Sequence, residues 1–257
     1  MRPLILTLLL IGCSQGAPPP PVVESACRND RFEGSAFTVC DGRGRVELRT
    51  GSRSFAALRS NLGRNAASVA FAMNAGMFDD DGRPIGLMIE DGRSVHAINR
   101  RKGYGNFHLM PNGVFLVRRG GKAEVVTSKA FKPAADIAYA TQSGPMLLID
   151  GKLHPKFDPD GMSRFVRNGV GIAPDGAPLF VISLDTVSFG KLARFMRDRL
   201  RVRDALYFDG SVSSLWDPAA NRMDAFTELG PMVVVFRPPS SSLTEASGPR
   251  REGRAIP

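Results

Sequence analysis

The sequence predicts an α+β fold, with many short strands, hairpins and a few helices arranged as a single mixed-sheet domain around a cleft. Three observations support this class. Gly and Pro are frequent, at 27 and 19 of 257 residues. Short apolar runs end at turn residues, as strands joined by tight turns do. Long helical patterns are few, and the roughly 210 residues of the expected domain suffice for one large core but are short for two.

Apolar spacing predicts two helices. The first covers residues 54–62, where Phe55, Leu58 and Leu62 share one face and a glycine follows. The second covers residues 188–200 and carries an apolar stripe at helical spacing, formed by Phe189, Leu192, Ala193, Met196 and Leu200. The stripe indicates packing against a core rather than a cofactor site.

Short apolar runs predict the strands. They are expected at residues 69–74, 87–90, 113–117, 146–149, 179–184, 206–209 and 232–236. The order of strand 179–184, the second helix and strand 206–209 predicts a strand-helix-strand unit. The remaining strands are expected to form hairpins and meanders.

Residues 1–12 are predicted to be a lipoprotein-type signal peptide, because an apolar run too short to span a membrane ends in Leu10-Ile11-Gly12-Cys13. This ending resembles a bacterial lipobox, whose cysteine, here Cys13, becomes the lipidated first residue. Ordinary signal cleavage beside an incidental cysteine is the alternative. We expect a Pro-rich tether over 13–25, the folded domain over 26–237 and a disordered tail over 238–257. The protein is therefore expected to be exported, as a periplasmic or cell-surface lipoprotein anchored to a membrane.

Two further cysteines, Cys27 and Cys40, lie in the expected domain. An exported chain meets an oxidising environment, where a cysteine pair tends to be bridged. Metal binding by this pair is disfavoured, since neither has a His or another Cys at ligand spacing. The sequence therefore predicts a disulfide at the first strand of the domain.

The formal net charge is +9, which suits anionic partners such as nucleic acid, anionic lipid or phosphorylated polymers. Nucleic acid is disfavoured because the chain is expected to be exported and has no dense basic stripe interleaved with aromatic residues. No metal or other cofactor is expected. The three His residues form no pair that would suit zinc. The run Asp79-Asp80-Asp81 resembles the start of a calcium loop, but Arg83 and Pro84 stand where a ligand and a glycine are needed.

The apolar run 205–208 predicts a buried strand that ends at Asp209. A glycine and nearby hydroxyl groups follow at Gly210, Ser211, Ser213 and Ser214. Strand ends followed by such turns often display reactive groups in α/β proteins. An ordinary Asp-Gly turn is the plain alternative.

Other polar groups stand at expected turns and strand ends. They are Asn74 after a buried strand, the run Gln142-Ser143-Gly144-Pro145, Arg167 with Asn168 before a Gly-rich strand, and the carboxylates Asp185 and Glu228. Backbone N–H groups of a Gly-Pro turn can receive an anion, and an arginine forms forked hydrogen bonds to phosphate or carboxylate. The alternatives are a turn-forming asparagine, a surface arginine and solvated carboxylates.

Together and in this order, these segments resemble the phosphodiester glycosidase family. The similarity spans residues 36–236 and rests on Asn74-Ala-Gly-Met-Phe78, Gly86-Leu87, Gly105-Asn106-Phe107, Pro111-Asn-Gly-Val-Phe115, Gln142-Ser-Gly-Pro145, Arg167-Asn-Gly-Val-Gly171, Ala205-Leu-Tyr-Phe-Asp209-Gly and Ser213-Ser214. The resemblance implies a mixed α/β fold around a cleft. It also implies hydrolysis of a sugar-1-phosphodiester to a free sugar and a phosphomonoester. One departure concerns Ser211-Val212, where members of the family often have two more glycines.

On this hypothesis Asp209, Arg167 and Asn74 form the catalytic group. Asp209 stabilises the positive charge that develops on the sugar, and Arg167 neutralises the leaving phosphate. The expected substrate-binding residues are Gln142, Ser143, Gly144, Asn168, Gly210, Ser213 and Ser214, while Asp185 and Glu228 compete for the place of a second carboxylate. The expected partners are a phosphorylated glycan or sugar-phosphodiester substrate and a membrane reached through the lipid anchor.

Two other functions remain open at this point. An anchored protein could hold an envelope glycan without cleaving it, and the departure at Ser211-Val212 keeps this alternative open. A calcium-dependent structural module built on residues 79–81 is the weakest of the three.

Overall fold

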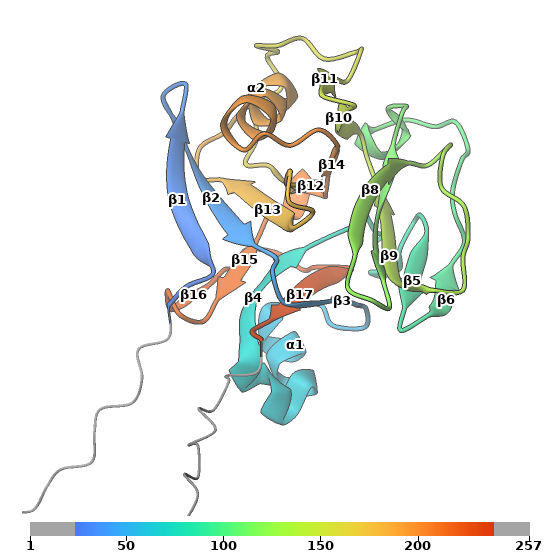
Figure 1. Ribbon diagram of the computed structural model, residues 1–257, viewed down its shortest axis with the longest axis vertical. Coiled ribbons are helices and arrows are strands. Elements are labelled where there is room, and N and C mark those ends of the chain that lie inside the picture. Colours follow the sequence, from blue (N-terminus) through green and yellow to red (C-terminus); the bar gives the residue numbers. More distant parts are fainter. Residues whose placement is uncertain (1–23, 239–257) are drawn as a thin grey trace, which may run out of the picture.

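Residues 24–238 are described by the computed structural model, and they form three antiparallel sheets and two α-helices (Figure 1). The predicted α+β class is confirmed, with the strands divided among three antiparallel sheets rather than gathered in one mixed sheet. The expected signal peptide, its Cys13 and nearly all of the expected tether and tail lie outside the described residues. Within residues 24–238 there is no helix with the length and apolar character needed to cross a membrane.

The largest sheet has seven strands and carries the candidate site. Its strand order is β1 (Cys27–Phe32), β2 (Ser35–Asp41), β13 (Pro178–Ser183), β12 (Asn168–Ile172), β14 (Ala205–Tyr207), β10 (Met146–Ile149) and β11 (Lys152–Leu153).

The other two sheets have five strands each. One has the order β16 (Arg222–Met223), β15 (Leu215–Asp217), β4 (Val69–Asn74), β17 (Met232–Phe236) and β3 (Arg45–Arg49). The other has the order β6 (Arg93–His96), β5 (Met88–Glu90), β9 (Ile137–Ser143), β7 (Gly113–Arg118) and β8 (Ala123–Thr127). In Figure 1 the second of these lies to the right, and the sheet with β4 and β17 lies at the centre.

The predicted strand-helix-strand unit is present, with one strand inserted in it. Strands β13 and β14 both pair antiparallel with β12, so they run parallel to each other on either side of it. Helix α2 (Phe189–Arg194) connects them and lies over the seven-stranded sheet, at the top of Figure 1. This arrangement brings the start of β12 and the end of β14 side by side at one end of these two strands, where the candidate site lies.

Both predicted helices form, and one differs in its second half. Helix α1 (Phe55–Leu62) begins after Ser54, whose side chain accepts the Ala57 N–H, and packs under the β4–β17 sheet. Helix α2 ends at Arg194, and residues Phe195–Arg199 continue as a π-helical turn instead of regular α-helix. The wider turn keeps the consecutive side chains of Phe195 and Met196 buried against the sheet.

A first strand was expected at the disulfide, but the bounds of the β1–β2 hairpin were not predicted, because β1 is polar, has three exposed and three half-buried residues, and lacks a clear apolar alternation. Cys27 and Cys40 face each other in its register and form the predicted disulfide. The bond fixes an edge strand that buries little surface of its own.

The three sheets meet at a cluster of phenylalanines. Phe180 of β13 packs against Phe71 of β4 at 5.5 Å and Phe115 of β7 at 5.6 Å between ring centroids. Phe208, directly after β14, lies 6.5 Å from the same ring. All four side chains are fully buried. Phe180 therefore holds the sheets together through one side chain.

Replacing Phe180 by Ala should lower the free energy of unfolding by about 3–5 kcal/mol, because it removes a large buried ring and leaves a cavity at the junction of the sheets. Urea denaturation followed by circular dichroism measures the change. Tyr104→Ala is the matched control, since that ring is fully exposed and its loss should cost less than about 0.5 kcal/mol. Equal midpoints for the two variants would contradict the role of Phe180.

Candidate active site

The candidate site forms where the end of β4, from one sheet, meets the start of β12 and the end of β14, from the seven-stranded sheet. Asn74 is the last residue of β4, Asn168 is the first of β12, and Asp209 follows β14. The Asp209 N–H donates to the carbonyl of Ala75 at 3.2 Å, and the Phe208 N–H donates to that of Asn168 at 3.1 Å. The structure therefore brings together three of the polar residues predicted from the sequence.

The side chain of Asn74 links these segments. Its amide nitrogen donates to the Asp209 carbonyl at 2.8 Å. Its amide oxygen accepts the Ser214 N–H at 2.9 Å and the Asn168 amide at 2.9 Å. Asn74 is 1% exposed, so it acts inside the protein and fixes both ends of the turn 209–214.

Ser213 and Ser214 are also engaged within the protein. The Ser213 hydroxyl lies 3.2 Å from the Asn168 side-chain oxygen and 3.2 Å from the Val166 carbonyl. The Ser214 hydroxyl donates to the Val212 carbonyl at 2.8 Å. We call the side chains of Asn74, Asn168 and Ser213, with the Ser214 N–H and the Asp209 carbonyl, the Asn74 network. It positions the turn that carries Asp209.

The Asp209 carboxylate is half-buried and only partly engaged. Its Oδ1 accepts the Ser211 N–H at 3.1 Å, and its Oδ2 has no hydrogen-bond partner among residues 24–238. Burial raises the pKa of this carboxyl above its ordinary value, while hydrogen bonding from Ser211 opposes the rise. One carboxylate oxygen is thus held in place and the other is available for chemistry.

Tyr207, two residues earlier, was not predicted as a site residue. A Cβ on Gly210 would overlap the Tyr207 hydroxyl, so only glycine allows the turn to pass this close. Burial raises the pKa of Tyr207 to about 12, against the opposing effect of Arg167. Tyr207 therefore stays neutral at physiological pH and bridges the Asp209 turn and Arg167.

Arg167 is 1% exposed, on the opposite face of β12 from Asn168. Its guanidinium stacks on the Phe189 ring at 3.6 Å and donates to the Val187 carbonyl at 2.8 Å and the Tyr207 hydroxyl at 3.3 Å. The Nη2 atom donates to the carbonyl and hydroxyl of Ser163, at 2.9 and 3.1 Å. All of these partners are neutral, so a buried positive charge lacks a counter-charge among the described residues.

A surface segment, residues 159–165, covers Arg167. At one end the Pro159 carbonyl accepts hydrogen bonds from Ser188 and Arg194 of the α2 region, at 3.2 and 2.6 Å. At the other end Phe165 and Val187 exchange backbone hydrogen bonds. Between these anchors the chain is mostly exposed and places Ser163 over the guanidinium.

Ser143 and Gly144 lie at the end of β9. The Ser143 hydroxyl is fully buried and has no hydrogen-bond partner among the described residues, 24–238, which is uncommon for a buried polar group. The next turn, Gly144-Pro145, contacts the site segment directly, because the Pro145 carbonyl accepts the Tyr207 N–H at 3.1 Å. These residues thus border the site on the side of the β7–β9 sheet.

Three of the predicted site residues lie outside this cluster. The Gln142 amide binds the backbone of Asn99 and Leu87, at 2.6 to 3.0 Å. The Asp185 carboxylate accepts the Ala36 N–H at 2.7 Å. Glu228 is exposed and pairs with Arg53 at 2.6 Å. The structure therefore brings neither candidate for the second carboxylate to Asp209.

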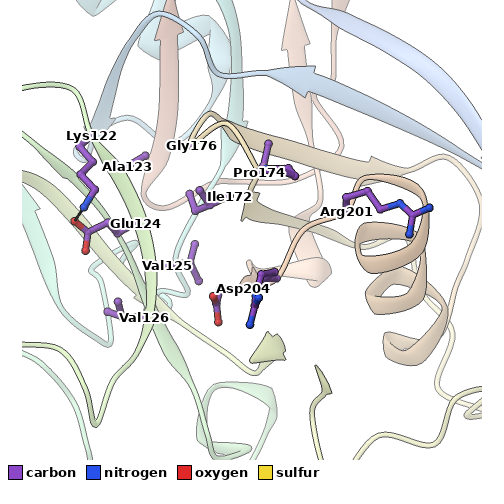
Figure 2. A pocket seen from close by; sticks show the side chains of 12 residues that line it. Lys122, Ala123, Glu124, Val125, Val126, Ile172, Pro174, Gly176, Arg201 and Asp204 are labelled. Atoms are coloured by element: carbon purple, nitrogen blue, oxygen red, sulfur yellow. Dashed lines mark ion pairs between the residues drawn. The ribbon is translucent and has the colours of Figure 1, made fainter. Parts of the chain in front are cut away.

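A separate pocket of 430 Å³ lies at the far end of β12 and β14. Figure 2 shows it between β8, with Lys122 and Glu124, and the segment that carries Arg201 and Asp204. Because Ile172 and Asp204 mark the ends of the strands opposite to Asn168 and Asp209, this pocket is not part of the candidate site. Among residues 24–238, no group of three or more His, Cys, Asp or Glu side chains is placed to hold a metal ion.

Replacing Asn74 by Ala should lower the free energy of unfolding by about 2–4 kcal/mol, because buried partners in the Asn74 network lose their hydrogen bonds. Chemical denaturation measures the loss. Asn65→Ala serves as control, since Asn65 is exposed and its replacement should change stability by less than about 0.5 kcal/mol. An Asn74→Ala protein as stable as the control would mean that the network does not hold the turn.

The comparison with known proteins identifies relatives in sequence and in structure. The phosphodiester glycosidase family matches residues 67–236, more than half of the chain. The uncharacterized protein YigE of Escherichia coli (strain K12) is 36% identical over 186 residues, which cover 70% of this chain and 73% of YigE.

Two solved structures share the fold. The catalytic domain of zebrafish N-acetylglucosamine-1-phosphodiester alpha-N-acetylglucosaminidase, auto-inhibited by its pro-peptide, matches with a TM-score of 0.59 and 14% identity, covering 86% of this chain and 85% of that one. A Burkholderia pseudomallei K96243 protein named as exported matches with a TM-score of 0.50 and 13% identity, covering 79% and 73% of the two chains. From the family match and the identity to YigE, we conclude that the chain belongs to the phosphodiester glycosidase family.

Proposed function

We propose that the protein is an exported hydrolase that cleaves the glycosidic bond of a sugar-1-phosphodiester, with Asp209 as catalytic carboxylate and Arg167 as phosphate-binding residue. The products are a free sugar and a phosphomonoester. Family membership supports the reaction class. The observation that carries the proposal is the buried Arg167, whose partners in the described part of the chain are all neutral and which reaches the Asp209 turn through the Tyr207 hydroxyl.

The chemistry at the sugar suits Asp209. Cleavage of the C1–O bond develops positive charge on the ring, which a nearby carboxylate stabilises as nucleophile or as base for water. Oδ1 is fixed by the Ser211 N–H, so the carboxylate has a defined orientation. Oδ2 accepts no hydrogen bond from residues 24–238, which leaves it able to approach C1 or a water molecule.

The chemistry at the phosphate suits Arg167. A departing phosphate is a good leaving group and needs its charge neutralised more than it needs a strong general acid. The guanidinium Nη1 carries two N–H groups and has one protein partner, Tyr207, so a donor remains for a phosphate oxygen. Ser163 binds Nη2 from an exposed segment, and a phosphate would take over these contacts when that segment moves.

The remaining residues near the site act as positioning residues in this proposal. Asn74, Asn168 and Ser213 hold the turn through buried hydrogen bonds. The Ser143 hydroxyl, a predicted substrate contact, is buried and has no hydrogen-bond partner among residues 24–238. Because Asp185 and Glu228 are engaged elsewhere, neither is assigned the place of a second carboxylate.

Export is part of the proposal. A disulfide such as Cys27–Cys40 persists in oxidising compartments and is rare in the cytosol. The Burkholderia protein with the same fold is named as exported. We place the protein in the periplasm or at the cell surface, held to a membrane by a lipid on Cys13.

The Asp209→Asn variant should lose at least about a thousandfold in turnover, because the amide can neither attack C1 nor stabilise the developing charge. Its free energy of unfolding at neutral pH should equal or exceed that of the wild type. Because the pKa of Asp209 is raised in the folded state, ionising this carboxyl lowers the free energy of unfolding at pH values above its ordinary pKa of 3.8. Sugar release from a panel of sugar-1-phosphodiesters and chemical denaturation measure the two effects.

Wild-type turnover should rise as pH increases through the raised pKa of Asp209, since the carboxylate must be ionised to act. The midpoint of this acidic limb should lie above 3.8. Turnover by Asp209→Asn at the wild-type rate would contradict the assignment of Asp209 as the catalytic carboxylate. If no substrate of the panel is cleaved but glycans bind, the protein is a non-catalytic glycan-binding lipoprotein, the alternative that Ser211-Val212 keeps open.

The Arg167→Met variant should lose about a hundredfold or more in kcat/KM, because a buried charge donor to the leaving phosphate disappears. Competitive inhibition by inorganic phosphate should weaken in parallel. Arg164→Met is the matched control, since Arg164 is an exposed arginine three residues away and should behave like the wild type. Similar losses in the two variants would show that general positive charge, not the buried guanidinium, matters.

A further inference from the structure

A pocket of 570 Å³ lies beside the Asp209 turn, and Arg167 is not among the residues that line it. We call it the Phe226 pocket. Its walls are Val166 and Leu184 from the β12–β13 pair, the turn 210–214, and residues of the segment 222–227. This volume falls within the range of roughly 300–1,000 Å³ that is typical of small-molecule sites.

The Phe226 pocket is separate from the centre described above but adjoins it. Val166 and Arg167 are consecutive, and only Val166 lines the pocket while Arg167 packs under α2. Ser211 lines the pocket and donates its N–H to the Asp209 carboxylate. A ligand in the pocket would therefore lie one turn of chain away from the catalytic carboxylate.

The polar wall is built from a paired arginine. Arg222 donates to both carboxylate oxygens of Asp224, at 3.0 and 2.7 Å, and Asp224 also accepts the Leu215 N–H at 2.9 Å. The Nη1 group of Arg222 has no partner among the described residues, which leaves planar N–H donors for ligand hydroxyls. Because the charges of the pair cancel, this wall favours a neutral polar ligand over a second phosphate.

An exposed aromatic side chain, Phe226, also lines the pocket. Phe226 is 84% exposed, and Leu184 beside the pocket is 43% exposed. A pyranose ring carries C–H bonds on one face and hydroxyls around its edge, so it can pack on an aromatic ring while its edge binds planar polar groups. A purely apolar ligand would desolvate the Nη1 group of Arg222 without giving it a hydrogen-bond partner, which is costly.

From these walls we infer that the Phe226 pocket binds a neutral sugar ring next to the one cleaved at Asp209. The substrate is then an oligosaccharide or glycan chain joined through a phosphodiester, rather than a single sugar phosphodiester. This inference rests on the proposed function for the identity of the reaction, but the binding of a sugar ring can be measured without it.

Binding of neutral oligosaccharides to the wild-type protein tests the inference. Isothermal titration with chitotriose, cellotriose and maltotriose should detect binding of at least one of the three. Phe226→Ala should weaken that binding about fivefold to tenfold, since it removes the stacking face, whereas Phe226→Tyr should retain it. Tyr104→Ala removes another exposed aromatic side chain, one outside the pocket, and should bind as the wild type does.

The inference is overturned if none of the three oligosaccharides binds, or if Phe226→Ala binds as tightly as Tyr104→Ala. Its failure is distinguishable from failure of the proposed function, because titration requires no turnover. Phe226-dependent binding without hydrolysis of any sugar-1-phosphodiester would support the sugar-binding pocket and contradict the proposed hydrolase activity. Hydrolysis without oligosaccharide binding would support the proposed hydrolase activity and contradict the sugar-binding pocket.

Discussion

The site depends on one buried amide, that of Asn74. Its three side-chain partners lie 94, 135 and 140 residues away in the sequence, so a single group sets the mutual position of β4, β12 and the turn after β14. The amide donates on one side and accepts on the other. An aspartate of the same shape would face the Asp209 carbonyl with a lone pair instead of a donor, so the arrangement requires asparagine.

The same edge of the sheet holds a charge that the protein does not neutralise. A buried guanidinium is costly to desolvate, and Arg167 recovers part of this cost from the Phe189 ring and from carbonyl and hydroxyl acceptors. A carboxylate beside it would stabilise the fold but would also compete with an anionic substrate. If a ligand supplies the anion, this explains why no carboxylate pairs with Arg167 among the described residues. The N–H donors of the guanidinium are then already held in position before the ligand binds.

Much of the architecture could be predicted from local sequence, and much of the site could not. The helices at 54–62 and 188–200 follow from apolar spacing, and Asp209 stands out because a carboxylate ends a buried strand. Tyr207 was missed because it belongs to that same apolar run, and only the tertiary fold places its hydroxyl between Arg167 and Gly210. Gln142, in contrast, was predicted to contact the ligand because it is polar, but its amide hydrogen-bonds to the backbone N–H and carbonyl of Asn99. Sequence patterns report which face of an element is apolar, whereas these hydrogen bonds depend on register between segments far apart.

The turn 210–214 explains how Asp209 and the Phe226 pocket can work together. Members of the family often have glycines where this chain has Ser211 and Val212, and glycines would leave the turn freer to move. Here Val212 packs against the core beside Trp216, and the Ser211 N–H holds the Asp209 carboxylate. One turn thus both holds the Asp209 carboxylate and lines the Phe226 pocket. On our proposals, a sugar ring in that pocket would contact the element that orients Asp209, so recognition of the glycan and alignment of the bond to be cleaved would depend on the same few residues.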